Sequence, residues 1–353
     1  MTLPKTQVGF CYDNESRKLV KVTDLPVKQP TRGEVLVKIE GAGLCNSDLH
    51  VLSPRGGPID LDGSNDKQRF VMGHEIAGRI VSVGEGTETT FKEGDRVAFF
   101  ITHACGQCLD CRLGRDNTCG AKAYGLNQDG GFQEYILVDK LRTLLPIPDN
   151  VSYEQACSAC DAILTPFHAI QKAKDVLTNP ATKVLVVGVG GLGMNAVQIL
   201  RNYPVDITAV DLKPELKESA LKFGANRFGT SLDQITDEDE EFEPMFNLVF
   251  DFIGSQGLYD SYYMQLQRRA KIMMVGLAKP TFQIHNFLNA MREIEIVFSF
   301  GGNSQEQLQV LEWISLGRLK PITSNAPLDE VPKYLQLLKE GKVVGRVVFQ
   351  PKL

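Results

Sequence analysis

The chain has 353 residues, of which 43% are hydrophobic and 23% charged, and its formal net charge is −5. This globular, mildly acidic composition argues against nucleic acid or an anionic membrane surface as a partner. No apolar run approaches the roughly 20 residues that span a bilayer, and the first residues lack the apolar core of a signal peptide. We therefore expect a cytoplasmic protein with two domains, because the length exceeds one ordinary core.

The first 150 residues are predicted to be rich in β-strands. Apolar residues alternate with polar ones, and glycines interrupt the runs, in EVLVKIEGAG (34–43), IAGRIVSVGEG (76–86) and GDRVAFF (94–100). Within this region Cys45, Ser47, His50, His74 and Glu75 stand out as candidates for a metal site. A catalytic zinc needs about three protein ligands and one open position. Cys45 and His74 are plausible ligands, although a lone cysteine or histidine more often only packs in a core.

Four cysteines form a tight cluster farther along the chain. Cys105, Cys108, Cys111 and Cys119 are spaced C-x2-C-x2-C-x7-C. Four thiolates this close can complete a tetrahedral zinc shell that leaves no position for substrate, so we predict a structural zinc. An iron–sulfur cluster is the rival, but the similar run of ferredoxins continues as C-x3-C-P. In a cytosolic chain such cysteines favour metal binding over disulfides.

The pattern changes to alternating helices and strands after residue 160. Apolar spacing predicts a helix in TPFHAIQKAKDVL (165–177), and two strand–helix pairs follow in 183–200 and 205–225. FNLVFDFIG (246–254) and RAKIMMVGLA (269–278) add two buried strands. This alternation predicts a doubly wound parallel sheet at 163–303, hence an α/β fold. The tail contains a helix in 305–317 and a final strand, GRVVFQP, which we expect to return to the first domain.

A glycine-rich turn joins the first strand of this sheet to its helix. Gly188, Gly190, Gly191, Leu192 and Gly193 form GVGGLG between the strand 183–187 and a helix. A lone GxGxxG is weak evidence, but strand, turn and helix are all present here. The glycines permit a tight turn, close approach of a pyrophosphate and close helix packing, and the helix N-terminus faces the phosphates. The alternative is a glycine turn without a ligand.

Asp211 ends the next predicted strand, 18 residues after Gly193. An acid at this position accepts hydrogen bonds from the ribose hydroxyls and repels a 2′-phosphate, which favours NAD(H) over NADP(H). Lys213 is close enough in sequence to soften that preference. The alternative role of Asp211 is a loop cap.

Taken together, the motifs resemble those of medium-chain, zinc-dependent alcohol dehydrogenases. The matching features are C-x-S-x-x-H (45–50), GHExxGxxxxxG (73–84), the four-cysteine cluster, GxGGxG and the terminal GRVV (345–348), in the family's order. GLCNSDLHV, VMGHEIAG, DAILTPFHAI and GRVVF are most similar to fungal NADH-dependent carbonyl reductases and secondary-alcohol dehydrogenases. The resemblance implies a β-rich, GroES-like catalytic domain (1–162 and 304–353) and a Rossmann domain (163–303).

The resemblance also implies roles for single residues. Cys45 and His74 would bind the catalytic zinc, and Glu75 would lie behind it and could enter its coordination. Ser47 and His50 would carry the proton. Arg346 would reach the cofactor pyrophosphate, and Val275 and Leu277 would lie near the nicotinamide.

The third zinc ligand is expected in SACDAILTPFHAI (158–170). Many relatives place a cysteine four residues before a threonine, and others place an aspartate there, as in D-x-x-x-T-x-F-H. Counting back from Thr165 gives Asp161, so the resemblance implies Asp161 as the ligand. A bound metal would balance an acid in this apolar stretch. Cys160 stays the alternative if the register slips by one residue.

The implied reaction is reversible hydride transfer between NAD(H) and ketones or secondary alcohols, with two zinc ions per chain. The catalytic zinc would act as a Lewis acid on the carbonyl oxygen. A polyol or primary-alcohol dehydrogenase of the same family is the nearest alternative, and a non-enzymatic cofactor-binding protein is a more remote one. The family forms dimers and tetramers, so we expect a homo-oligomer, with a dimer favoured.

Overall fold

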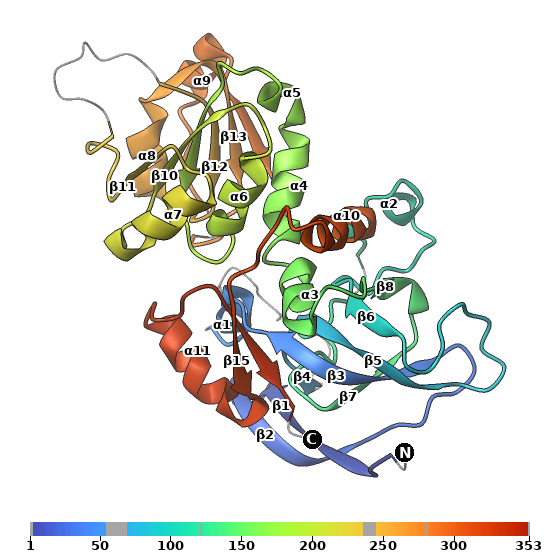
Figure 1. The fold of residues 1–353 in the computed structure, drawn as a ribbon. Helices are drawn as coiled ribbons and strands as arrows, with labels where there is room; N and C mark the ends of the chain where they lie inside the picture. Colours follow the sequence, from blue (N-terminus) through green and yellow to red (C-terminus); the bar gives the residue numbers. More distant parts are fainter. Residues whose placement is uncertain (1–2, 54–68, 121, 236–244, 280, 352–353) are drawn as a thin grey trace. The chain divides into compact units, whose positions relative to one another are not determined.

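The computed structural model (Figure 1) describes residues 3–53, 69–120, 122–235, 245–279 and 281–351. The chain divides into two compact units. Met1–Leu164 and Asn303–Leu353 form the first unit, and Thr165–Gly302 form the second unit. Among the described residues, no helix combines the length and the apolar character needed to cross a membrane.

The first unit is built on two β-sheets. Strands β2 (Lys18–Pro26), β1 (Thr6–Asp13) and β4 (Phe70–Val71) form a three-stranded sheet in that order. A seven-stranded sheet has the order β15-β16-β3-β5-β6-β8, and β7 also pairs with β3. Its strands are β3 (Val35–Gly43), β5 (Glu75–Val83), β6 (Arg96–Phe99), β7 (Tyr135–Val138), β8 (Leu144–Pro146), β15 (Thr323–Pro327) and β16 (Arg346–Gln350).

Apolar side chains of β3, β5 and β6 form the centre of this unit's core. Val37 and Ile80 face each other across the antiparallel β3–β5 pair, and both are buried together with Phe99, Phe132 and Phe349. The helices of this unit are α1 (Asn46–Val51), α2 (Leu109–Arg112), α3 (Tyr153–Cys160), α10 (Ser304–Ser315) and α11 (Val331–Lys339). Because β16 pairs with β3, the C-terminal strand returns to this sheet, as the sequence predicts.

The second unit contains a six-stranded sheet in the order β11-β10-β9-β12-β13-β14, flanked by helices (Figure 1). All five neighbouring pairs are parallel. The strands are β9 (Lys183–Val187), β10 (Asp206–Val210), β11 (Arg227–Gly229), β12 (Phe246–Asp251), β13 (Leu266–Met274) and β14 (Glu295–Phe298). The helices are α5 (Lys174–Leu177), α6 (Gly193–Leu200), α7 (Lys217–Phe223), α8 (Gln256–Tyr263) and α9 (Asn286–Arg292), and α4 (Leu164–Lys172) starts at the boundary.

This strand order reverses direction between β9 and β12, which is the doubly wound topology predicted from the sequence. The predicted α/β fold class is therefore confirmed. One element differs from its prediction. The helix expected over 165–177 is two helices, because Ala173 adopts a turn conformation between α4 and α5.

Candidate active site and metal centres

Strand register in the first unit brings Cys45, His74 and Glu75 together. Gly43 at the end of β3 pairs with Glu75 at the start of β5, so the residues that follow β3 lie beside those that precede β5. A Cβ atom on Gly43 would lie 2.1 Å from Oε2 of Glu75. Glycine is therefore required here to leave room for the buried Glu75 carboxylate.

Helix α3 ends one residue before Asp161, which completes this group. Ser152 caps its N-terminus, with reciprocal bonds between Ser152 and Gln155. Asp161 follows the last helical residue, and its Oδ2 lies 3.2 Å from Cys45 Sγ and 3.5 Å from His74 Nε2. Ligand atoms of Cys45, His74, Glu75 and Asp161 all lie within 4.8 Å of one another.

Cys160, the alternative ligand, has a different environment. Its thiol donates to the backbone oxygens of Ile76, at 3.4 Å, and Ala156, at 3.3 Å. Burial raises the pKa of the Cys160 thiol to about 12. The side chain therefore behaves as a buried neutral thiol, and the geometry favours Asp161 in this register.

Asp48 is a buried carboxylate that no sequence motif singles out. Its Oδ1 lies 3.2 Å from His74 Nδ1, and its Oδ2 accepts the amide of Cys45 at 2.9 Å. A carboxylate on Nδ1 fixes the ring orientation and leaves Nε2 facing the site. The available signal was an acid three residues after Cys45, at the third position of α1.

Glu75, a member of this group, forms a buried ion pair with Arg346. Oε1 of Glu75 lies 3.1 Å from a guanidinium nitrogen of Arg346 and accepts the Ala162 amide at 3.1 Å. Another guanidinium nitrogen donates to the Leu44 carbonyl at 2.9 Å. Burial raises the pKa of Glu75, and Arg346 opposes that shift. The predicted contact of Arg346 with a cofactor stays a prediction.

The chemistry of this group fits a divalent metal ion. Two of its buried atoms, His74 Nε2 and Glu75 Oε2, make no hydrogen bond. Asp48, Glu75 and Asp161 bring three carboxyl groups to this region, and Arg346 brings one guanidinium. Sulfur, imidazole nitrogen and carboxylate oxygen are all zinc ligands, and a bound cation would favour the charged forms of Cys45 and Asp161.

Ser47 and His50 lie on α1, next to this group. Ser47 Oγ is 3.8 Å from Cys45 Sγ. His50 is half-buried, its Nδ1 atom makes no hydrogen bond, and burial lowers its pKa. His50 is thus neutral near pH 7 and able to accept a proton. Their roles in proton transfer stay predictions.

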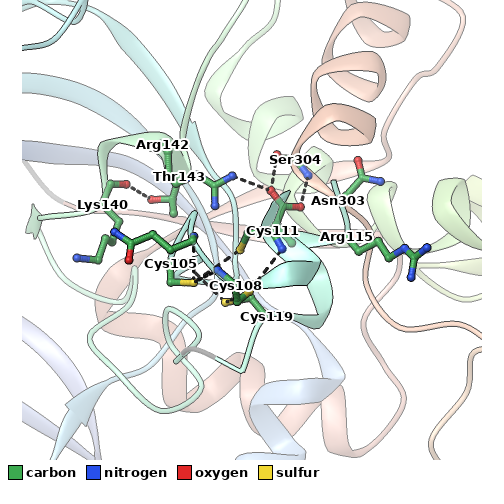
Figure 2. A network of polar contacts seen from close by, with 12 residues as sticks. Cys105, Cys108, Cys111, Arg115, Cys119, Lys140, Arg142, Thr143, Asn303 and Ser304 are labelled. Carbon is green, nitrogen blue, oxygen red and sulfur yellow. Dashed lines mark hydrogen bonds and ion pairs between the residues drawn. The ribbon is translucent and has the colours of Figure 1, made fainter. Parts of the chain in front are cut away.

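The four cysteines of the second cluster surround a common point (Figure 2). Their sulfur atoms lie within 4.8 Å of one another, and all four are free thiols. Hydrogen bonds from the amides of Gln107 and Cys108 lower the pKa of Cys105 to about 6. Sulfur atoms held this close, with backbone donors that favour thiolate, fit a tetrahedral zinc ion.

The glycine turn in the second unit has the geometry expected of a nucleotide-binding turn. Gly188 has a positive φ of 82°, and a Cβ atom on Gly193 would lie 1.9 Å from the Gly188 carbonyl oxygen. A Cβ atom on Gly190 would meet no protein atom within 4 Å. Gly188 and Gly193 are therefore needed by the fold itself. Leu192 directly precedes Gly193, the first residue of α6.

Asp211 follows β10 and bonds the glycine turn. Its Oδ2 accepts the Val189 amide at 2.9 Å, and its Oδ1 accepts the Lys213 amide at 3.1 Å. Asp211 therefore does cap the loop, and these hydrogen bonds hold its carboxylate beside the glycine turn. Val275 and Leu277 follow β13, Val275 buried and Leu277 44% exposed. Cofactor contacts of these residues stay predictions.

Comparison with protein families matches most of the chain in two segments. Residues 31–149 match the alcohol dehydrogenase GroES-like domain, and residues 191–315 match the zinc-binding dehydrogenase family. An NAD-dependent alcohol dehydrogenase of Sulfurisphaera tokodaii is 31% identical over 345 residues, 96% of this chain and 98% of that protein.

Solved structures agree with this result. Acetophenone reductase from Geotrichum candidum, in complex with NAD, is 34% identical with a TM-score of 0.86, over 99% of this chain and 98% of that one. The alcohol dehydrogenase of Aeropyrum pernix is 29% identical with a TM-score of 0.87, over 98% of this chain and 100% of that one.

Proposed function

The chain belongs to the medium-chain, zinc-dependent alcohol dehydrogenase family, and on that premise we propose that it is an NAD(H)-dependent ketone reductase and secondary-alcohol dehydrogenase. The observation that carries the proposal is the group formed by the buried Cys45 and His74 with the partly exposed Asp161 in the first unit. The glycine turn with Asp211 supports the cofactor assignment. The 34% identity to an acetophenone reductase bound to NAD supports ketones as substrates.

Different residues of the chain would bind the metal ion and orient its ligands in this reaction. Cys45, His74 and Asp161 would hold a zinc ion, which when bound polarises a carbonyl oxygen as a Lewis acid. Asp48 orients the His74 ring and the start of α1. The surrounding buried side chains exclude water, so charges in the site are weakly screened.

Proton transfer would use the two polar side chains of α1. The Ser47 hydroxyl can donate to an oxygen and accept in return. His50, neutral at pH 7 because burial lowers its pKa, would take up or release the proton toward solvent. Gly188 to Gly193 with Asp211 would bind NAD(H), which when bound would supply or accept the hydride.

Sugar or polyol oxidation is the second candidate. A D-arabinose 1-dehydrogenase (NADP(+)) of Saccharolobus solfataricus is 30% identical over 94% of both chains. A panel of an aryl ketone, an aliphatic ketone, a primary alcohol and a pentose, each with both cofactors, separates the readings. We expect the highest kcat/KM for a ketone with NADH. Turnover confined to the pentose, or faster with NADP(H), would favour the second candidate.

We further propose a homodimer formed through β14, with a tetramer as a larger alternative. This strand is an edge of the six-stranded sheet, and Phe298 and Phe300 at its end are 65% and 66% exposed. On α9, Phe287 and Met291 are 76% and 53% exposed. An exposed apolar edge strand favours pairing with a second copy.

Light scattering tests the oligomeric state. Phe298→Lys should convert the dimer to a monomer, whereas Leu316→Lys, at an exposed position of the first unit, should leave it intact. A wild-type chain of 39 kDa in solution would contradict the proposal. We also propose a cytoplasmic location, supported by cysteine clusters that fit metal binding rather than disulfide formation, which is the usage typical of reducing compartments.

A further inference from the structure

The chain leaves the first unit after Leu164 and re-enters it at Asn303. Both of these points make contact with the same feature, the four-cysteine lobe, which we define as residues 105–119. The candidate catalytic group and the glycine turn lie in different units, so the proposed reaction depends on these two connections. The contacts that fix these two connections are therefore relevant to the proposed reaction.

The first connection is held by apolar packing. Leu164, the last residue of the first unit, is 2% exposed and belongs to a buried cluster with Phe100, Ala104, Cys111 and Cys119. Two of the residues it packs with are candidate zinc ligands. The position of Leu164 therefore depends on a formed lobe.

The second connection is held by a buried carboxylate of the lobe. Asp116 is 2% exposed and lies three residues before Cys119. Its Oδ1 accepts the Ser304 amide at 3.1 Å and its Oδ2 accepts the Ser304 hydroxyl at 2.6 Å. Ser304 is the first residue of α10 and directly follows Asn303, where the chain re-enters the first unit. The lobe therefore binds the chain one residue after that point.

Two further contacts, made by Arg142 and Gln307, help to hold the lobe and the start of α10 in place. Arg142 lies 3.6 Å from Asp116 Oδ2, and its side-chain carbon Cδ would be 3.2 Å from a Cβ atom on Gly106, inside the lobe. Figure 2 shows Arg142, Ser304 and the four cysteines in one polar network. The side chain of Gln307, in the first turn of α10, donates to the Phe99 carbonyl at 3.0 Å.

Two glycines lie shortly before the hydrogen-bonded Ser304. Gly301 and Gly302 are the last residues of the second unit, and Gly301 has a positive φ of 54° with open space around its Cα. Glycine pairs give the backbone wide freedom. Ser304 therefore lies two residues after a glycine pair, where the backbone of this connection has the most conformational freedom.

We propose that the four-cysteine lobe anchors both connections between the two units, and that Asp116 is the positioning residue that ties the lobe to α10. The lobe thereby has a second task beyond its own stability, which is to set where the chain re-enters the first unit. Its consequence for cofactor binding rests on the proposed function, whereas the anchoring itself does not.

Hydrogen exchange of the full chain tests the anchoring. In Asp116→Ala, protection of the peptide 303–310 should fall about ten- to hundredfold, the loss expected when hydrogen bonds to a buried carboxylate are removed. Asp110→Ala, which removes a partly exposed acid of the same lobe, is the matched control and should leave that peptide unchanged. Zinc content should stay at two per chain in both variants.

A milder pair of variants covers the case in which Asp116→Ala does not fold. Ser304→Ala removes only the hydroxyl bond, and Ser304→Thr retains it. We expect the KM for NADH to rise about fivefold in Ser304→Ala with kcat within a factor of two, a typical coupling between distant sites. Ser304→Thr should restore the wild-type KM.

One result would overturn the anchoring, namely wild-type protection of 303–310 in Asp116→Ala, or in Ser304→Ala if the former does not fold, with both zinc ions present. A wild-type KM for NADH in Ser304→Ala would instead overturn the consequence of the anchoring for cofactor binding. If the wild-type chain oxidises no NADH with any ketone, the proposed function fails, and hydrogen exchange alone decides the anchoring.

Discussion

The Nδ1 atom of His74 lies 3.2 Å from Oδ1 of Asp48, and both side chains are buried. A carboxylate that orients a metal-binding imidazole typically contributes about ten- to hundredfold to metal affinity. Asp48→Ala should therefore weaken zinc binding at Cys45, His74 and Asp161 by that factor and spare the four-cysteine zinc. Competition with a zinc chelator measures both sites. Equal retention of both ions by wild type and variant would contradict this role.

Asp211 should determine the choice between NADH and NADPH. Its carboxylate also accepts the Val189 amide, so Asp211→Ala removes both a charge and a turn hydrogen bond. Asp211→Asn removes the charge and keeps an acceptor for that amide. We expect the ratio of kcat/KM for NADPH over NADH to rise at least about tenfold in both variants.

The stability of the two variants separates the two roles of Asp211. Asp211→Ala should lower the free energy of unfolding by about 1–3 kcal/mol more than Asp211→Asn does, because alanine leaves both the Val189 and Lys213 amides without an acceptor, whereas asparagine keeps one acceptor oxygen. An unchanged cofactor ratio in both variants would show that another residue discriminates.

Ser47 should be needed for proton transfer but not for metal or cofactor binding. Removing a group that transfers a proton typically slows the reaction about a hundredfold or more. Ser47→Ala should show that loss in kcat for ketone reduction, with two zinc ions and a wild-type Kd for NADH. Ser47→Thr retains the hydroxyl and should recover most of the rate. Full turnover in the alanine variant would exclude the relay.

Asp251 should make stability depend on pH. Burial raises its pKa, and this outweighs the hydrogen bonds from Ile253, Gly254 and Tyr262 that favour the charged form. A carboxyl whose pKa is higher in the folded state contributes stability below its unfolded pKa of about 4, and loses it as pH rises through the folded pKa.

The variant Asp251→Asn should not show this loss, because it has no titrating group. The free energy of unfolding of the variant, minus that of the wild type, should therefore increase as pH rises from about 4 through the raised pKa. Denaturant unfolding across that range measures the difference. A difference that stays constant or decreases over that range would mean that the hydrogen bonds offset or outweigh burial.

Local sequence patterns were sufficient to predict the fold class and the close cysteine cluster. The strand, glycine turn and helix around Gly188 lie within one short segment, and Cys105 to Cys119 span fifteen positions. Contacts set by strand register could not be foreseen in this way. Asp48 meets His74 only because β3 pairs with β5.

The same limit applies to the contact between the lobe and α10. Asp116 and Ser304 are 188 residues apart in sequence, and neither belongs to a recognisable motif. The break at Ala173 is also invisible to apolar periodicity, because the apolar spacing continues across it. Counting from Thr165 predicts Asp161 as the third ligand, and its position beside Cys45 is compatible with that count, but its metal binding stays a prediction.

The zinc content of Asp161→Ala, compared with that of Cys160→Ala and the wild type, tests the central claim most directly. Elemental analysis should find two zinc ions in the wild type and in Cys160→Ala, and one in Asp161→Ala. Ketone-dependent oxidation of NADH should be lost in Asp161→Ala alone. Two zinc ions in Asp161→Ala, or one in Cys160→Ala, would contradict a Cys45, His74 and Asp161 zinc site.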